Sequence, residues 1–208
     1  MLTVLEFAEP LREEDADPSP FDQFTRWFGE AAGLGLRVPE AATLATATND
    51  GVPSARIVLV KVRDEAGFVF FSNYESRKGR ELAANPRAAL VFHWDALGRQ
   101  VRVEGCVERT SPEESAGYVR SRPRGSQLSA LASPQSEAVE GRDLLERRVA
   151  ELAAEYKGRA LPEPENWGGF RLLPDEFEFW QHREDRLHDR LRYTRQPDGR
   201  WLVERLAP

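Results

Sequence analysis

The sequence RLHDR, near the C-terminus, contains the residues best suited to chemistry. Arg186, His188 and Arg190 alternate along it, so on a β-strand their three side chains would project from one face. Two guanidinium groups and a protonated imidazole repel one another, and an anion or an electron-rich ring between them would relieve the repulsion. The alternative is a solvated strand face with surface salt bridges. The run therefore predicts either a ligand-binding face or an ordinary polar surface.

A second group of polar side chains could hold a phosphate. Tyr118 and Arg122 are four residues apart, hence on one face of a helix, and Ser126 lies in the turn after Pro123. A phenol, a guanidinium and a hydroxyl that converge can together donate several hydrogen bonds to phosphate oxygens. A helix end with ordinary polar residues is the alternative interpretation.

Basic residues also occur where a helix is expected to begin. Ser76 can cap a helix that runs to about residue 85, which places Arg77 and Lys78 in its first turn. Acidic residues are favoured in a first turn, because the free N–H groups there create a positive potential. A bound phosphate would account for two cations at this position, although such pairs also occur in helices that bind nothing.

Arg56 and Lys61 flank the apolar run IVLV. A spacing of five places them on opposite faces of a regular strand, so they either contact two different groups or a bulge intervenes. A lysine on a strand rich in valine and isoleucine is partly desolvated, and it then needs an anionic partner. If both charges simply reach solvent from the strand ends, no ligand is required.

Other residue types narrow the chemistry. Trp180 could flank a planar ring or pack in the core, and Cys106, in a strand-like run, is expected to be a small core residue. His93 and His182 have no metal-like spacing with carboxylates, so we expect no metal site. The sequence contains neither a glycine-rich dinucleotide fingerprint nor a nucleophile elbow.

Length and charge limit the class of protein. The chain has 208 residues and a net charge of -6, which suits one domain and argues against a general nucleic-acid binder. No basic and apolar leader and no apolar run of about 18 residues occurs, so we expect no membrane span and a cytoplasmic location. Residues 1–20 are acidic and contain prolines, which predicts a flexible arm before a single domain over 21–208.

Hydrophobic periodicity predicts short strands joined mostly by tight turns, with a few helices. Helices are expected over 21–32, 76–85, 111–122 and from a Ser136 cap to Gly158. Strands are expected over 43–48, 54–62, 68–72, 87–94, 99–109, 169–173, 176–181, 187–194 and 200–205. Hairpin links join antiparallel strands, so the order favours a mainly β fold, an antiparallel barrel with flanking α helices.

Taken together, the motifs resemble the pyridoxine/pyridoxamine 5′-phosphate oxidase family. The matching stretches, in order, are RIVLVK (56–61), FFSNYESRK (70–78), RQVRVEG (99–105), SRPRGSQ (121–127), SPQS (133–136), WGGFR (167–171), EFWQ (178–181), RLHDR (186–190) and RLAP (205–208). They span nearly the whole chain, and RLHDR with SRPRGSQ is the most specific combination. The resemblance implies an antiparallel split β-barrel (FMN-binding split barrel) and a homodimer, with flavin mononucleotide (FMN) in the groove between subunits.

The resemblance also implies roles for individual residues. The positions that match the family's FMN-contacting set are Arg56, Ile57, Val58, Leu59, Val60, Lys61, Phe71, Ser72, Arg77, Lys78, Gln100, Gln135, Ser136, Trp180 and Arg190. The positions that match its substrate set are Lys61, Tyr118, Arg122, Ser126, Arg186 and His188, of which Arg186 and His188 are expected to be catalytic.

The activity implied is FMN-dependent oxidation of pyridoxine or pyridoxamine 5′-phosphate to pyridoxal 5′-phosphate in vitamin B6 biosynthesis or salvage. O2 would accept the electrons and give H2O2. Two stretches depart from the family. Phe71 and Ser72 replace a frequent Tyr-Thr pair, and residues 3–6 lack the basic and tyrosine residues of the arm that closes over the substrate. The alternatives are a related flavin oxidase of another substrate, such as a phenazine precursor, and a non-catalytic flavin- or pyridoxal-phosphate-binding protein.

Overall fold

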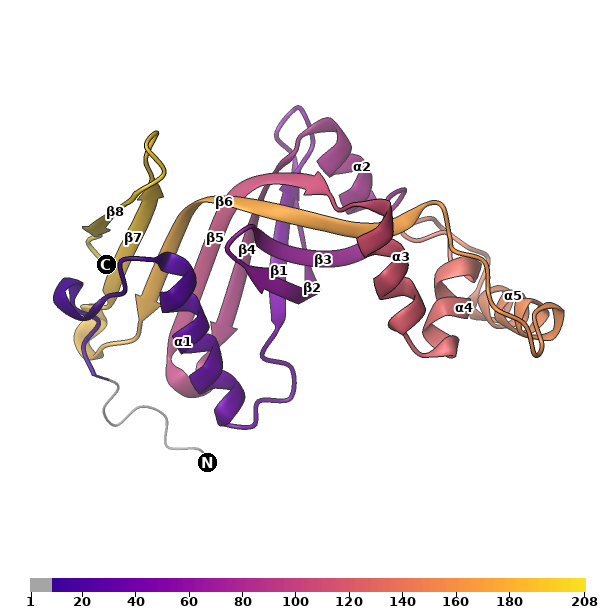
Figure 1. Ribbon diagram of the computed structural model, residues 1–208, viewed down its shortest axis with the longest axis horizontal. Helices are drawn as coiled ribbons and strands as arrows, with labels where there is room; N and C mark the ends of the chain where they lie inside the picture. Colours follow the sequence, from indigo (N-terminus) through magenta and orange to yellow (C-terminus); the bar gives the residue numbers. More distant parts are fainter. Residues whose placement is uncertain (1–8) are drawn as a thin grey trace.

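The computed structural model describes residues 9–208, and its centre is one antiparallel sheet closed into a barrel. The strand order is β3-β2-β1-β4-β5-β6, and β6 pairs with β3 as well as with β5, which closes the ring. Strands β7 and β8 continue the sheet on the other part of β6 (Figure 1). The expectation of an antiparallel split β-barrel is confirmed.

Most elements lie within a few residues of the ranges expected from the sequence. The strands are β1 (Ala41–Ala47), β2 (Pro53–Asp64), β3 (Gly67–Asn73), β4 (Arg87–Trp94), β5 (Arg99–Arg109), β6 (Trp167–Gln181), β7 (Asp189–Arg195) and β8 (Trp201–Arg205). The helices are α1 (Pro20–Gly33), α2 (Arg77–Ala84), α3 (Pro112–Ser121), α4 (Arg124–Ala132) and α5 (Arg142–Glu155), with short 3-10 helices at Glu13–Asp15, Asp95–Leu97 and Glu184–Arg186.

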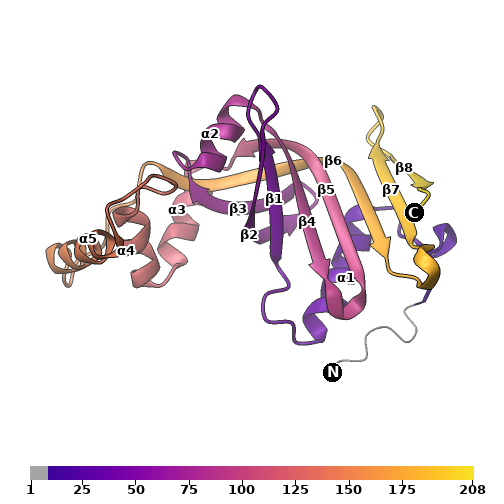
Figure 2. The same ribbon diagram turned by 180° about the vertical axis from the view of Figure 1, so that it is seen from behind.

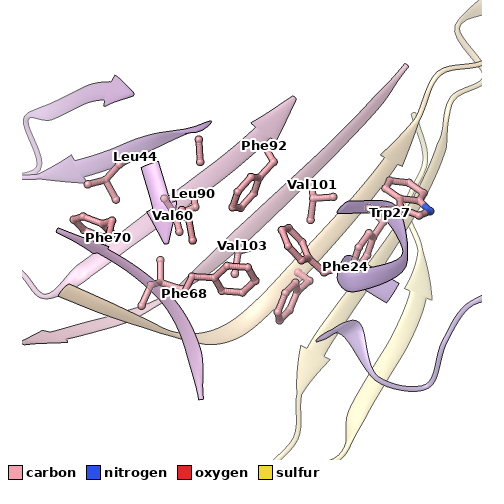
Figure 3. Close-up of a cluster of buried hydrophobic side chains, with 14 of the residues drawn as sticks. Phe24, Trp27, Leu44, Val60, Phe68, Phe70, Leu90, Phe92, Val101 and Val103 are labelled. Carbon is pink, nitrogen blue, oxygen red and sulfur yellow. The ribbon is translucent and has the colours of Figure 1, made fainter. Parts of the chain in front are cut away.

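Helix α1 packs against the inner face of the barrel and completes its core. Ser19 caps the helix, and Pro20 follows at a position where a missing N–H costs nothing. The Phe24 ring lies 4.9 Å, centroid to centroid, from the rings of both Phe68 and Phe92 in edge-on contacts. Figure 3 shows Phe24 and Trp27 of α1 facing the apolar side chains of the strands. Burial of this aromatic cluster fixes α1 on the sheet.

Strand β6 is longer than expected. We predicted two strands, over 169–173 and 176–181, but β6 is continuous across both. The register against β5 shifts between Glu104 and Gly105, so Asp175 of β6 has no pairing residue on β5. A Cβ on Gly105 would lie 2.0 Å from the Leu173 carbonyl oxygen, so only glycine fits this close approach. A bulge therefore bends the strand where the sequence indicated a break.

The region after β5 departs most from expectation. Helix α4 was not predicted, since Gly125 and two serines, Ser126 and Ser129, blur its apolar periodicity. The helix expected from a Ser136 cap begins instead at Arg142, because Ser136 has a left-handed φ of 75° that interrupts helical geometry. Helix α5 packs against α4, and Figures 1 and 2 show both helices projecting beyond one end of the barrel.

The expectation that Cys106 is a core residue is wrong. Cys106 is exposed, not a core residue, because β5 turns Val103 and Val107 inward and Cys106 outward.

Residues 3–6 lie outside the described part of the chain. Leu11 is buried and its backbone N–H donates to Asp189, but the flexible arm over 1–20 stays a prediction. Within residues 9–208, no helix combines the length and apolar character needed to cross a membrane.

Candidate functional site

Three cations from two elements meet at the start of α2. The Ser76 hydroxyl accepts from the Gly79 backbone N–H at 3.3 Å, which confirms the predicted cap and fixes Lys78 in the first turn. Lys78 is only 8% exposed, and its Nζ donates to Ser72 Oγ at 3.0 Å. Arg77 follows the same cap, and Arg56 arrives from β2. Burial, and then the nearby charge of Arg56, lower the pKa of Lys78.

One buried carboxylate, Glu81, lies among these cations. Its Oε1 accepts from Arg77 Nε at 2.8 Å, and its Oε2 accepts from Ser54 Oγ at 2.6 Å and from Arg56 Nη2 at 3.3 Å. Thr46 donates a further hydrogen bond to Oε2. Burial raises the pKa of Glu81, but these hydrogen bonds outweigh it and bring the pKa to about 2. The cluster therefore keeps an excess of positive charge.

The depressed pKa of Glu81 predicts a pH-dependent stability. Between pH 4.5 and about 2 the unfolded chain binds more protons at this residue than the folded chain does. The contribution of Glu81 is thus complete above pH 4.5 and is lost as the pH falls toward 2. Urea unfolding at several pH values from about 6 to about 3 should show a steeper loss for the natural protein than for Glu81→Gln. Equal pH dependence in the two proteins would contradict the prediction.

An open pocket of about 310 Å³ adjoins the cation cluster. Its polar lining includes Ser72, Arg122, Ser126 and Gln135. Ser72 Oγ donates to Gln135 Oε1 at 3.1 Å and accepts from Lys78. A continuous chain of hydrogen bonds thus joins the buried lysine to the wall of the pocket, and Ser136 follows Gln135 directly in the chain.

Aromatic rings line one side of this pocket. Phe71 stacks on Tyr118 with a centroid distance of 3.7 Å, and the Arg122 guanidinium lies 4.6 Å above the Trp167 ring. Arg122 Nη1 is buried and has no hydrogen-bond partner among the described residues. A buried donor without an acceptor costs about 1–3 kcal/mol. The structure therefore brings Arg122 and Ser126 to one pocket, where the donor would be satisfied by an anion, whereas Tyr118 does not line this pocket but stacks on Phe71 of its wall.

The RLHDR motif does not form the strand that we predicted. Strand β7 begins at Asp189, and Arg186 ends a 3-10 turn in which its φ is 61°. The Arg183 backbone N–H donates to His188 Nδ1 at 3.0 Å, and Arg183 Nε donates to Asp189 Oδ2 at 2.7 Å. These bonds stabilise a turn in place of the strand. The expected common strand face for Arg186, His188 and Arg190 is therefore wrong, and only Arg190 lies on β7.

The turn sets the chemistry of His188. Because Nδ1 accepts a hydrogen bond, the neutral ring carries its hydrogen on Nε2, which can donate to a ligand. The Trp180 ring lies 4.6 Å from the His188 ring, and Trp180 pairs across the sheet with Gln100 and Arg190. Arg190 Nε donates to the buried Glu178 carboxylate at 2.8 Å. These side chains form a second group.

The two groups lie at opposite ends of β6. Trp167 borders the pocket, whereas Trp180 belongs to the second group. Thirteen residues separate them, and a strand rises about 3.3 Å per residue, so the groups are roughly 40 Å apart along the strand. One ligand cannot contact both groups of the same chain.

Strand β2 carries the remaining predicted residues. Its register against β3 shifts between Val60 and Val62, so a bulge at Lys61 does intervene after Arg56. Lys61 does not line the pocket; its Nζ donates to Glu40 Oε1 at 3.0 Å. Ile57 and Leu59 are exposed, Val58 is half-buried and Val60 is buried.

Glu81 and Glu178 were not among the residues predicted from the sequence. Glu81 follows Arg77 by four residues, a spacing that brings helical side chains together and could have indicated an ion pair. No local signal indicated that Glu178 would be buried between Arg102 and Arg190, because its partners lie on neighbouring strands.

Comparison with known proteins relates this chain to a family. The model described as pyridoxamine 5′-phosphate oxidase matches residues 29–156, and the model described as the pyridoxine 5′-phosphate oxidase C-terminal dimerisation region matches residues 167–208. The chain is 59% identical over 198 residues to a pyridoxine/pyridoxamine 5′-phosphate oxidase of Rubrobacter xylanophilus, which covers 95% of this chain and 91% of the relative. A Paraburkholderia phymatum protein with the same description is 57% identical over 194 residues, covering 93% of this chain and 91% of the relative.

Solved structures agree with the fold. PhzG from Burkholderia lata, in complex with tetrahydrophenazine-1-carboxylic acid, has a TM-score of 0.88 at 35% identity and covers 94% of this chain and 95% of its own. An FMN-binding protein of Nostoc punctiforme, related to pyridoxamine 5′-phosphate oxidase, has a TM-score of 0.71 at 16% identity and covers 92% and 100%. The second likeness shows the fold alone. The two family matches and the identity to curated relatives establish that this chain belongs to the pyridoxine/pyridoxamine 5′-phosphate oxidase family of oxidoreductases.

Proposed function

We propose that this chain binds FMN and oxidises pyridoxine or pyridoxamine 5′-phosphate to pyridoxal 5′-phosphate, with O2 as the electron acceptor and H2O2 as the second product. The observation that carries the proposal is a pair of places at one end of the barrel where positive charge or an unpaired hydrogen-bond donor favours the binding of an anion. One is the cation cluster of Arg56, Arg77 and Lys78, and the other is the pocket where Arg122 Nη1 lacks an acceptor. Two phosphorylated ring compounds would satisfy both.

The cation cluster fits the phosphate of FMN. Lys78 is buried beside Arg56, and the single carboxylate of Glu81 does not balance the three cations of the cluster, so a further anion would lower the free energy of the site. Ser72 and Gln135 add polar groups to the wall of the adjoining pocket, and Ser136 is the next residue along the chain. When bound, FMN supplies the two-electron redox chemistry, while the protein binds and orients both reactants.

We propose that a second copy of the chain completes each site. The second group cannot reach its own chain's pocket, and the C-terminal region matches a dimerisation model. Ile57 and Leu59 expose 65% and 41% of their surface on β2, which an interface would cover. The residues proposed to contact FMN across the two copies are Arg56, Ile57, Val58, Leu59, Val60, Lys61, Phe71, Ser72, Arg77, Lys78, Gln100, Gln135, Ser136, Trp180 and Arg190.

The residues proposed to bind the substrate have two different roles. Lys61, Tyr118, Arg122 and Ser126 are proposed to anchor the 5′-phosphate and so position the carbon that reacts. To bind the phosphate, Lys61 would have to give up the hydrogen bond that its Nζ donates to Glu40. The partner's turn then presents Arg186 and the Nε2–H of His188 to the substituents of the pyridine ring.

Replacement of Arg186 tests the catalytic part of the proposal. Arg186→Ala is expected to lower kcat/KM by at least about tenfold, or about 1.4 kcal/mol, because a charged contact to the substrate is lost. FMN content should stay unchanged, since Arg186 is not proposed to hold the cofactor. Steady-state kinetics with flavin absorbance measure both quantities, and Arg195→Ala, an exposed arginine on β7, is the control. A near-normal kcat/KM would remove Arg186 from the active site.

The function itself is tested with the purified protein. FMN titration should give a stoichiometric yellow complex, and pyridoxamine or pyridoxine 5′-phosphate should then yield pyridoxal 5′-phosphate, O2 uptake and H2O2. A protein that holds no flavin even in excess FMN would overturn the proposal. Flavin binding without O2 uptake would indicate a non-catalytic binding protein.

A second candidate is oxidation of a phenazine precursor. It is favoured by the likeness to PhzG, which was solved with a tetrahydrophenazine carboxylic acid. A phosphate-free tricyclic substrate leaves the donors of Arg122 and Ser126 without a phosphate partner, which argues for the first proposal. Comparison of turnover of the two substrate classes by one preparation decides between them.

A further inference from the structure

We infer that Glu81 is a positioning residue of the FMN-phosphate site, and that it holds Arg56 and Arg77 side by side in the geometry that receives the phosphate. The inference rests on the proposed binding of FMN. It assigns a function to an acidic residue in a place where the ligand itself is an anion.

The contacts of Glu81 join three elements of the fold. Thr46 lies on β1, Ser54 and Arg56 lie on β2, and Arg77 opens α2. All four side chains donate to this one carboxylate, which is only 5% exposed. Oε1 accepts the hydrogen bond from Arg77, while Oε2 accepts those from Arg56 and from the hydroxyls of Thr46 and Ser54.

The two arginines need such a partner. Their guanidinium groups would otherwise repel one another and the buried Lys78, most strongly at Arg56, which is 20% exposed, and less at the more exposed Arg77. A guanidinium has five N–H donors, and Arg77 uses only its Nε–H for the hydrogen bond to Glu81. Among residues 9–208 no acceptor is bonded to its Nη atoms, which stay available to a phosphate. Glu81 thus fixes Arg77 directly and leaves its Nη donors free. Arg56 is held by Glu81, by the Leu44 carbonyl, and by the hydroxyls of Thr46 and Ser54, which accept from Arg56 because they donate to Glu81.

Charge and position predict opposite results when Glu81 is replaced. Removal of a negative charge near a phosphate would, by Coulomb's law alone, strengthen FMN binding. Glutamine keeps one acceptor oxygen and replaces the other by an NH2 group, which cannot accept from an arginine, so either Arg56 or Arg77 would be released. Because every hydrogen bond that joins the two arginines passes through this carboxylate, we expect the loss of position to dominate.

The test compares FMN with riboflavin, which lacks the phosphate. In fluorescence titrations of the full-length protein, Glu81→Gln should weaken FMN binding about 10- to 100-fold, as supporting residues of binding sites do. Glu81→Asp keeps the charge but is too short to reach both arginines, so it should show the same loss. Riboflavin affinity should stay within about twofold in both variants. Glu146→Gln removes the exposed pair of Arg142 and Glu146 at the same helical spacing and is the matched control.

The possible outcomes separate the inference from the function that it deepens. Unchanged or tighter FMN binding in both variants would overturn the inference, and so would an equal loss for riboflavin, which indicates general destabilisation. If Glu81→Gln does not fold, Glu81→Asp decides alone by the same FMN-to-riboflavin ratio. A natural protein that binds no FMN would overturn the proposed function, and the inference with it.

Discussion

Arg122→Ala is expected to lower kcat/KM for pyridoxamine 5′-phosphate by about 100-fold, which corresponds to about 2.7 kcal/mol. Arg122 Nη1 is buried without a hydrogen-bond partner among the described residues, and the guanidinium is held over the Trp167 ring. A hydrogen bond from such a charged donor to a phosphate contributes about 1.5–3 kcal/mol. Because the phosphate lies away from the reacting carbon, the loss should appear mainly as a higher KM.

Two comparisons make this result specific. Arg120→Ala removes an exposed arginine of α3 that pairs with Glu163, and it should leave kcat/KM nearly unchanged. Pyridoxamine without its phosphate should be a poor substrate of both the natural protein and Arg122→Ala, so the preference for the phosphorylated form should collapse in the variant. If the preference survives, Arg122 does not bind the phosphate.

Phe24→Ala is expected to lower the free energy of unfolding by about 3–5 kcal/mol, the range typical of large aromatic residues removed from a core. Phe24 is 2% exposed, and its ring contacts Phe28, Phe68, Phe92 and Trp94. The cavity left behind would separate α1 from the inner face of the barrel. Urea unfolding measures the change, with protein and FMN concentrations held fixed because both affect apparent stability.

Its control lies on the same segment. Leu34, just after α1, is 57% exposed, and Leu34→Ala should change stability by no more than about 0.5 kcal/mol. A loss below about 1 kcal/mol for Phe24→Ala would show that α1 contributes little to the barrel core. The pocket contains no residue of α1, so the folded fraction of Phe24→Ala should keep its kcat/KM.

Local signals in the sequence determined many elements. Ser76 and Ser111 cap α2 and α3 where they were expected, because a cap depends on hydrogen bonds to the next three residues. Val101, Val103 and Val107 alternate along the sequence and all three are buried in β5, since side-chain direction in a strand has a period of two. The motifs from 56 to 208 also predicted the family that the comparisons show.

Tertiary structure decided where the chemical groups stand. Arg186 left the expected strand because Arg183 bonds to His188 and Asp189 across a turn, a choice among local bonds that alternation cannot reveal. Glu81 gathers donors from β1, β2 and α2, up to 35 residues away, which become neighbours only when the barrel closes. The length of β6 separates Trp180 from Trp167 and so requires a second copy for the proposed site. A sequence pattern reports neighbours within a few residues, whereas strand register and barrel closure set every longer contact.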